Sequence, residues 1–292
     1  MKTIILICSA ALLLTPFCLS ASPLTESTFT EVVNQVSTVS VSGNAAPSKV
    51  NDLLKAPDRV RTGPQSRAEL TAPDKTITRV GANTIFSFSD SGRTLNLEQG
   101  NLLFHSPKGL GGGTIQSGGA AAAVLGTTLI VSATTSGGFK VILLEGTGKV
   151  TLPGGTAATL HAGQLVFVLP GGKLSPVLNI NLGKLTGGSL LVKGFSKDLP
   201  SWPLVLAAIH QQETTIASGG ARDTGQSPDQ YLYPPANGLD VQSPGTYQQA
   251  VPQPPSANQY LNAVGTGSSA KGNGFGGFGG RGFVGTTVPL PF

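Results

Sequence analysis

The chain has 292 residues, of which 11% are charged, and 19 Lys and Arg against 14 Asp and Glu give it a net charge of +5. Its cations are scattered, with no run of five like charges, whereas nucleic-acid binding needs clustered cations that neutralise several phosphates. Composition therefore argues against a nucleic-acid partner. Both cysteines, Cys8 and Cys18, lie in the first 21 residues, so the remainder has neither disulfides nor thiolate metal sites.

Residues 1–21 have the pattern of a secretory signal peptide. Lys2 supplies a positive start, Ile4–Leu14 form a short apolar run, and Ser20 with Ala21 offers a cleavage site. An uncleaved membrane anchor is the alternative, although the run is short for a membrane span. Phe17 before Cys18 does not fit a lipoprotein signal. We expect an exported protein, periplasmic or extracellular, whose mature chain has no membrane span.

Short strands are expected from about residue 30 to residue 170. The stretches "EVVNQVSTVSV", "TIFSFS" and "TLNLEQG" alternate polar and apolar residues, as strands with one buried face do. The stretches "GTTLIVSAT", "FKVILLEG" and "GQLVFVLPG" are apolar enough for burial on both faces. We predict an all-β domain of short strands, intermediate between a β-sandwich and a β-solenoid.

Glycines mark the points where strands are expected to restart. A glycine suits such a point because the chain needs a positive φ or a tight bend there. The uneven spacing of these glycines argues against a strict solenoid. They are Gly81, Gly100, Gly126, Gly146 and Gly163.

Residues 171–216 are expected to form a linker of strands with one helix at about 202–213. Ser201 is a plausible N-cap, and Pro203 is tolerated in a first helical turn. The helix should pack on the sheet, although binding to a partner is the alternative. Its expected apolar stripe is Trp202, Leu204, Ala207 and Ala208.

Residues 217–292 are rich in Gly, Pro, Gln, Ser and Asn. Such a composition cannot bury enough apolar surface to fold, so we predict a disordered, low-complexity tail. Its spaced aromatic residues, in repeats such as "GFGGFGG", favour an adhesive segment as the alternative.

No residue pattern predicts a catalytic, cofactor or metal site. His105, His161 and His210 are widely separated and lack an HExxH pairing, and neither a GxSxG nor an SxxK motif occurs. Nothing in the sequence pairs two carboxylates across a sugar. The stretch "GLGGGT" at 109–114 lacks the GK[ST] of a phosphate-binding loop and is expected to be an ordinary loop. We therefore expect a non-enzymatic protein without a cofactor.

The ordered segments "TGPQSRAEL", "DKTITRVGANTIF", "GTTLIV", "EGTGKV" and "AGQ" resemble the FecR domain family over roughly residues 32–169. The resemblance implies an envelope β domain that senses a signal from an outer-membrane iron-siderophore transporter. The best-known members also carry a cytoplasmic anti-sigma segment and a membrane helix. Neither is expected here, where a signal-peptide pattern comes first, so we expect a stand-alone exported FecR-like protein.

The same segments predict which residues face outward. Ala68 and Leu70 should enter the core, while Arg67 and Glu69 point away from it and pair with a neighbouring strand. The expected partner-binding surface consists of Arg67, Glu69, Arg79 and Trp202. The expected partner is an envelope or surface protein, or a polysaccharide. A matrix protein that associates through its tail is the alternative.

Overall fold

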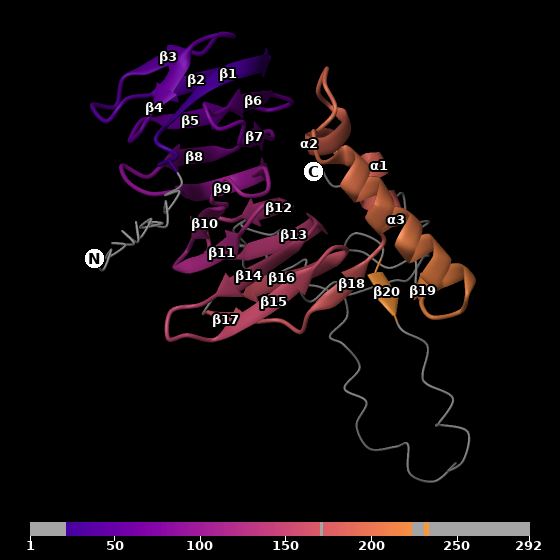
Figure 1. The fold of residues 1–292 in the computed structure, drawn as a ribbon. Coiled ribbons are helices and arrows are strands. Elements are labelled where there is room, and N and C mark those ends of the chain that lie inside the picture. The colour runs from indigo at the N-terminus through magenta and orange to yellow at the C-terminus, as the bar shows by residue number, and fades with distance from the viewer. Residues whose placement is uncertain (1–21, 170–171, 224–230, 234–292) are drawn as a thin grey trace, which may run out of the picture.

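The computed structural model of the chain describes residues 22–169, 172–223 and 231–233. The expected signal peptide lies outside the described residues, and so does most of the expected tail. Within these residues, strands stack along the body of the molecule and the helices lie along one side (Figure 1). The predicted all-β domain followed by a helix is confirmed. Within the described part of the chain, no helix combines the length and apolar character needed to cross a bilayer.

One sheet carries the helices on its outer face and is called the helix-side sheet. All its pairings in the described chain are antiparallel. The strands in order are β4 (Leu53–Lys55), β1 (Glu26–Val33), β6 (Arg67–Thr71), β7 (Ile77–Val80), β9 (Thr94–His105), β12 (Thr128–Ala133), β13 (Phe139–Glu145), β16 (Gln164–Leu169), β17 (Lys173–Leu174), β18 (Leu178–Ile180), β20 (Tyr231–Tyr233) and β19 (Arg222–Asp223). Both β17 and β18 pair with β16, and β18 continues through β20 to β19.

The second layer is called the outer sheet. Its pairings are antiparallel except for the parallel pairing of β9 with β10. In order its strands are β3 (Ala45–Pro47), β2 (Val36–Val39), β5 (Arg59–Thr62), β8 (Ile85–Phe88), the first half of β9, β10 (Gly113–Ser117), β11 (Ala120–Val124), β14 (Thr147–Thr151) and β15 (Ala157–His161).

Strand β9 belongs to both sheets. Its first half pairs with β8 in the outer sheet, and from Gly100 onward it pairs with β12 in the helix-side sheet. Gly100 has a φ of +93°, and a Cβ there would collide with Thr84. The expectation that Gly100 starts a new strand was therefore wrong. Left-handed backbone at this glycine instead bends one continuous strand from layer to layer.

The other expected restart glycines divide into two kinds. Gly126, Gly146 and Gly163 have positive φ values of 66°, 79° and 78°, as predicted. Gly81 does not have a positive φ. A Cβ at Gly81 would lie 3.3 Å from the main-chain oxygen of Asn101, so glycine allows close packing there rather than a turn.

Apolar side chains form two layers. Between the sheets, Phe86 and Phe88 pack edge to face with ring centroids 5.5 Å apart. The second layer lies between the helix-side sheet and the helices, and it includes Ile130 and Ile142. Strands β12 and β13 serve both layers, and every residue of both strands is buried. The prediction that these two strands are buried on both faces is confirmed.

The helices are α1 (Leu182–Gly188), α2 (Leu190–Lys193) and α3 (Trp202–Ala217). The predicted helix corresponds to α3, whose buried residues are Val205 and Ile209. The expected stripe was partly wrong, because Leu204 is 44% exposed and Ala207 is exposed. Successive helical residues differ by about 100°, so one helix cannot bury Leu204 together with Val205 and Ile209 on so narrow a face. Helices α1 and α2 were not predicted, because both are short and α1 contains three glycines, which disfavour a helix.

A buried polar cluster joins the start of α3 to the helix-side sheet. The hydroxyl oxygen of Thr128 lies 2.9 Å from His105 Nδ1, 3.0 Å from Glu145 Oε1 and 2.7 Å from Ser201 Oγ. All four residues are buried. Ser201 occupies the predicted N-cap position, but its side chain makes no capping hydrogen bond and contacts Thr128 instead.

Burial, and secondarily the Arg79 guanidinium, lower the pKa of His105 to about 4. The folded state therefore prefers the neutral imidazole, and the stability that depends on it is complete above the ordinary pKa of about 6.5. That stability is lost as the pH falls from about 6.5 toward 4. Burial also raises the pKa of Glu145, which has the opposite effect on acidification, so the wild-type curve alone cannot isolate His105.

The variant His105→Gln isolates this effect. We expect wild-type protein to lose on the order of 2 kcal/mol more unfolding free energy than the variant between pH 7 and pH 4.5, because only the imidazole must gain a proton in a buried site. Urea denaturation across this pH range measures the difference. Parallel curves for the two proteins would contradict the prediction.

Candidate functional site

Three charged residues form a row across the edge of the helix-side sheet. The strand register places Glu31 of β1 opposite Glu69 of β6, and Glu69 opposite Arg79 of β7. Arg79 is fully buried and donates from Nε to Glu69 Oε2 at 2.8 Å. Glu69 is also buried and accepts a hydrogen bond from Thr30 Oγ1 at 2.8 Å. The predicted pairing of Glu69 with a neighbouring strand is confirmed.

Arg79 binds residues 189–198, which we call the latch segment. Its Nη1 donates to the main-chain oxygens of Leu191 at 3.2 Å and Val192 at 3.1 Å, and its Nη2 donates to that of Lys197. The Phe195 ring lies over the guanidinium, with 4.5 Å from Cζ to the ring centroid. These contacts satisfy a charge that would be costly to bury alone.

Two further residues of the helix-side sheet also bond the latch segment. Arg67 donates from Nε to the main-chain oxygen of Gly194, and its Cζ lies 5.9 Å from the Phe195 ring centroid. Glu31 Oε2 accepts from the main-chain nitrogen of Ser196 at 2.9 Å and from its hydroxyl at 2.6 Å. Burial acts to raise the pKa of Glu31, but the Ser196 hydrogen bonds and the two arginines outweigh it and lower the pKa.

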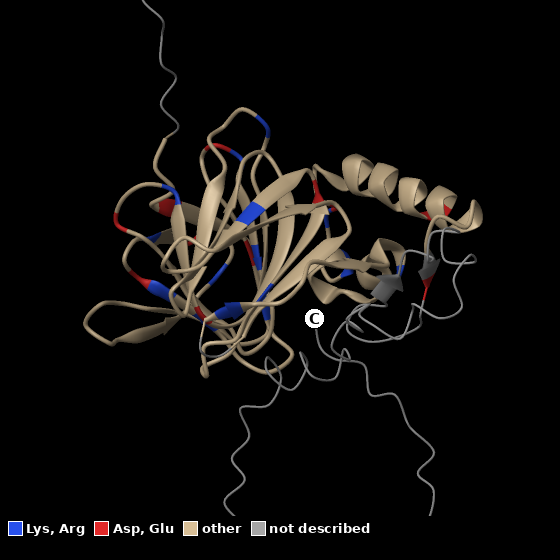
Figure 2. Ribbon diagram, turned by 90° about the horizontal axis from the view of Figure 1, so that it is seen from below, with Lys and Arg blue, Asp and Glu red and all other residues tan. Residues whose placement is uncertain are grey.

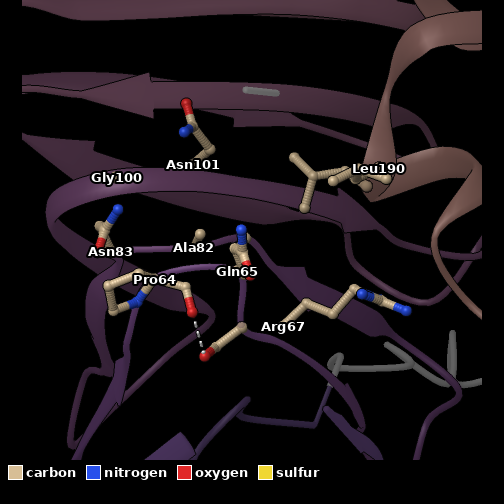
Figure 3. A pocket seen from close by; sticks show the side chains of 11 residues that line it. Pro64, Gln65, Arg67, Ala82, Asn83, Gly100, Asn101 and Leu190 are labelled. Carbon is tan, nitrogen blue, oxygen red and sulfur yellow. Dashed lines mark hydrogen bonds between the residues drawn. The ribbon is translucent and has the colours of Figure 1, made fainter. Parts of the chain in front are cut away.

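A cavity of about 620 Å³ opens beside the latch segment and is called the hollow. It lies where the β5–β6 turn, the β7–β8 turn and the middle of β9 meet α2. Figure 3 shows Leu190 of α2 on one side of the cavity, with Pro64 and Asn83 on the other. The lining residues with side chains that matter below are Gln65, Arg67, Asn83, Asn101, Leu190 and Leu191.

Both turns of the hollow contain left-handed non-glycine residues. Gln65 and Asn83 each have a φ of +53°. Asn34 donates from its side chain to the Gln65 carbonyl at 2.6 Å, and Gln99 donates to the Asn83 carbonyl at 3.1 Å. Such backbone costs about 1–3 kcal/mol per residue and persists only where neighbours hold it. The lining of the hollow is therefore a braced structure.

Ser66 also braces the β5–β6 turn. Its hydroxyl donates to the Pro64 carbonyl at 3.0 Å and accepts from the Gln35 main-chain nitrogen at 3.0 Å. The dashed line in Figure 3 marks the first of these bonds.

The lining of the hollow carries a single charged side chain. Arg67 is the one charged residue among its lining residues, which include no carboxylate, imidazole or thiol. General acid–base catalysis needs a titratable group within hydrogen-bond reach of the substrate. Among the described residues, no group of three or more His, Cys, Asp and Glu side chains is placed to hold a metal ion. Lys and Arg are spread over the described ribbon and do not gather on one face (Figure 2).

The four residues of the expected partner-binding surface are brought together only in part. Glu69 and Arg79 are buried beneath the latch segment, so the expectation that they face solvent is corrected: the chain covers its own polar face. Arg67 is partly exposed and borders the hollow. Trp202 is partly buried at the start of α3, with Lys193 Nζ 4.1 Å from its ring centroid. Binding of a partner by these residues stays a prediction.

Of the six lining residues named above, only Arg67 was expected from the sequence to belong to a binding surface. Gln65 and Asn83 lie in turns next to Pro64 and Gly81, where the sequence gives a turn signal but no functional one. Asn101 and Leu190 have no local signal, because only the fold brings α2 next to the middle of β9.

Comparisons with known proteins place this site in a family context. Residues 58–148 match the family model described as FecR protein, which confirms the resemblance over that range. The comparison with curated proteins finds no match. Two crystal structures of a protein described as a "putative anti-sigma factor" from Parabacteroides distasonis ATCC 8503, at 1.65 Å and 2.50 Å resolution, are similar at 17% identity. The alignments cover 61% of this chain and 99% of the other, with TM-scores of 0.41 and 0.40.

The contribution of the buried Arg79–Glu69 ion pair to stability can be measured directly. Arg79→Met leaves the Glu69 carboxylate buried without its cation, and we expect a loss of about 3–5 kcal/mol in unfolding free energy. The double variant Arg79→Met with Glu69→Leu should lose less, because it removes the stranded charge. Urea denaturation measures both.

The matched control is Arg59→Met. Arg59 lies 3.4 Å from Glu98 with both side chains 46% exposed, so its loss should cost about 1 kcal/mol or less. If the single Arg79→Met variant were as stable as the double variant, the unpaired Glu69 carboxylate would not be the cause of the lost stability.

Proposed function

Because residues 58–148 carry a FecR domain, we propose that the chain is a non-catalytic recognition protein of the bacterial cell envelope. Its β domain binds a protein partner through the hollow, in a sensing or regulatory role. The signal-peptide pattern of residues 1–21 supports export to the periplasm or beyond.

The observation that carries this proposal is the composition of the hollow. Every lining residue except Leu190 and Leu191 comes from the range that matches the FecR family. The family-like segments "TGPQSRAEL" and "RVGANT" supply both turns. A braced, concave site with few polar groups is the usual form of a recognition site, and the family's motifs build it here.

The latch segment sets the extent of the recognition unit. We place the β domain at residues 30–170, with a linker at 171–216 and a tail at 217–292. Arg67, Arg79 and Glu31 bond the latch segment, and Leu190 forms one wall of the hollow. The recognition unit therefore includes the linker, and a chain cut at residue 170 would expose the Arg79 charge.

A site-specific cross-linking experiment tests the proposal. A photoreactive amino acid replaces the exposed Asn83 in the full chain, and a second protein carries it at Leu125, which is 71% exposed and does not line the hollow. We expect a discrete cross-linked protein from the native cell envelope at position 83 and none at position 125. The product should disappear when Leu190→Asn is added.

Two outcomes would contradict the proposal. Equal cross-linking at positions 83 and 125 would show non-specific contact, and the absence of any product at position 83 would refute recognition through the hollow.

A further inference from the structure

The helix-side sheet already recognises one peptide, its own latch segment, by main-chain groups. Arg79 and Arg67 donate to four carbonyl oxygens of this segment, and Glu31 accepts from the Ser196 main-chain nitrogen. Phe195 is the one side chain of the segment that lies over the guanidinium groups. This face of the sheet is therefore built to hold a peptide by its backbone.

The hollow lies next to the latch segment, on the same side of the helix-side sheet. Leu191 both lines the hollow and bonds Arg79 through its carbonyl oxygen. Leu190, next to it, is 56% exposed and presents an aliphatic wall. A ligand in the hollow would lie against α2 and extend the layer that the latch segment begins.

Three side-chain amide groups line the hollow. In the described part of the chain, no hydrogen bond joins the side-chain amides of Gln65, Asn83 or Asn101 to another protein group, although all three residues line the cavity. An amide side chain offers one acceptor and two donors. It can therefore pair with both the N–H and the C=O of a peptide group.

The lining disfavours other classes of ligand. Arg67 is the sole cation there, and its Nε is engaged with Gly194, whereas phosphate recognition uses guanidinium groups in bidentate geometry or helix N-termini. The lining includes no aromatic ring on which a sugar face could stack. A lining whose single cation already bonds the latch segment, and which adds amide groups and an aliphatic wall, matches an uncharged peptide.

We infer that the hollow binds an uncharged, extended peptide segment of a protein partner, with an aliphatic side chain inserted beside Leu190 and peptide groups paired with Gln65, Asn83 and Asn101. This assignment rests on the proposed function and narrows it to one class of partner segment. The partner peptide and the latch segment then form one layer over the helix-side sheet.

Small probes test the ligand class with the full chain. N-acetyl-leucine methylamide supplies an aliphatic side chain between two peptide groups, and methyl glucoside and inorganic phosphate represent the other classes. Nuclear magnetic resonance of isotope-labelled protein follows the side-chain amide signals of Gln65, Asn83 and Asn101. We expect the leucine compound alone to shift them saturably, with affinity in the millimolar range typical of so small a ligand.

Two leucine variants show whether the leucine compound binds in the hollow. Leu190→Asn should weaken binding of the leucine compound at least fivefold, while Leu125→Asn, at a comparably exposed leucine away from the hollow, should leave it unchanged. Equal binding by wild-type protein and Leu190→Asn would overturn the assignment. So would shifts caused by methyl glucoside or phosphate, or no shift with any probe.

The two proposals fail separately. If position 83 still cross-links an envelope protein but the leucine compound does not bind, recognition through the hollow stands and the peptide class falls. If the leucine compound binds but no cross-link forms, the ligand class stands and the envelope function falls.

Discussion

The structure depends on one buried positive charge. Arg79 is fully buried, and the groups that compensate it come from two distant parts of the chain: Glu69 on the neighbouring strand, and the carbonyl oxygens of the latch segment more than a hundred residues later. Removing either set would leave a charge without partners in a low-dielectric site. This requirement fixes the latch segment on the sheet, and the latch segment in turn forms one wall of the hollow.

A single cross-strand row shows how the helix-side sheet divides its outer face. From β1 to β16 the register aligns Glu31, Glu69, Arg79, Leu103, Ile130, Ile142 and Leu165. The polar end of this row binds the latch segment through main-chain groups, whereas the apolar end packs in the layer beneath the helices. The hollow lies next to the polar end, where side chains of the sheet meet α2.

Local patterns in the sequence were enough to predict the strands but not the site. Alternation placed Phe86 and Phe88 in the core, and continuous apolar runs identified β12 and β13 as buried on both faces. The same alternation placed Arg79 on the face of its strand that points away from the core between the two sheets, which is correct. It could not reveal that α2 and Phe195 cover that face, because the stretch "SLLVKGFSKD" has neither a helical nor a strand period. Leu190 and Asn101 were not predicted as neighbours either, because only tertiary packing brings them together.

The crossing of β9 from one sheet to the other has a consequence for how the molecule comes apart. One unbroken strand supplies ladder hydrogen bonds to β8 in the outer sheet and to β7 and β12 in the helix-side sheet. Neither layer can lose its central strand while the other keeps it. The two sheets therefore share a single cooperative unfolding unit, despite their separate hydrogen-bond networks.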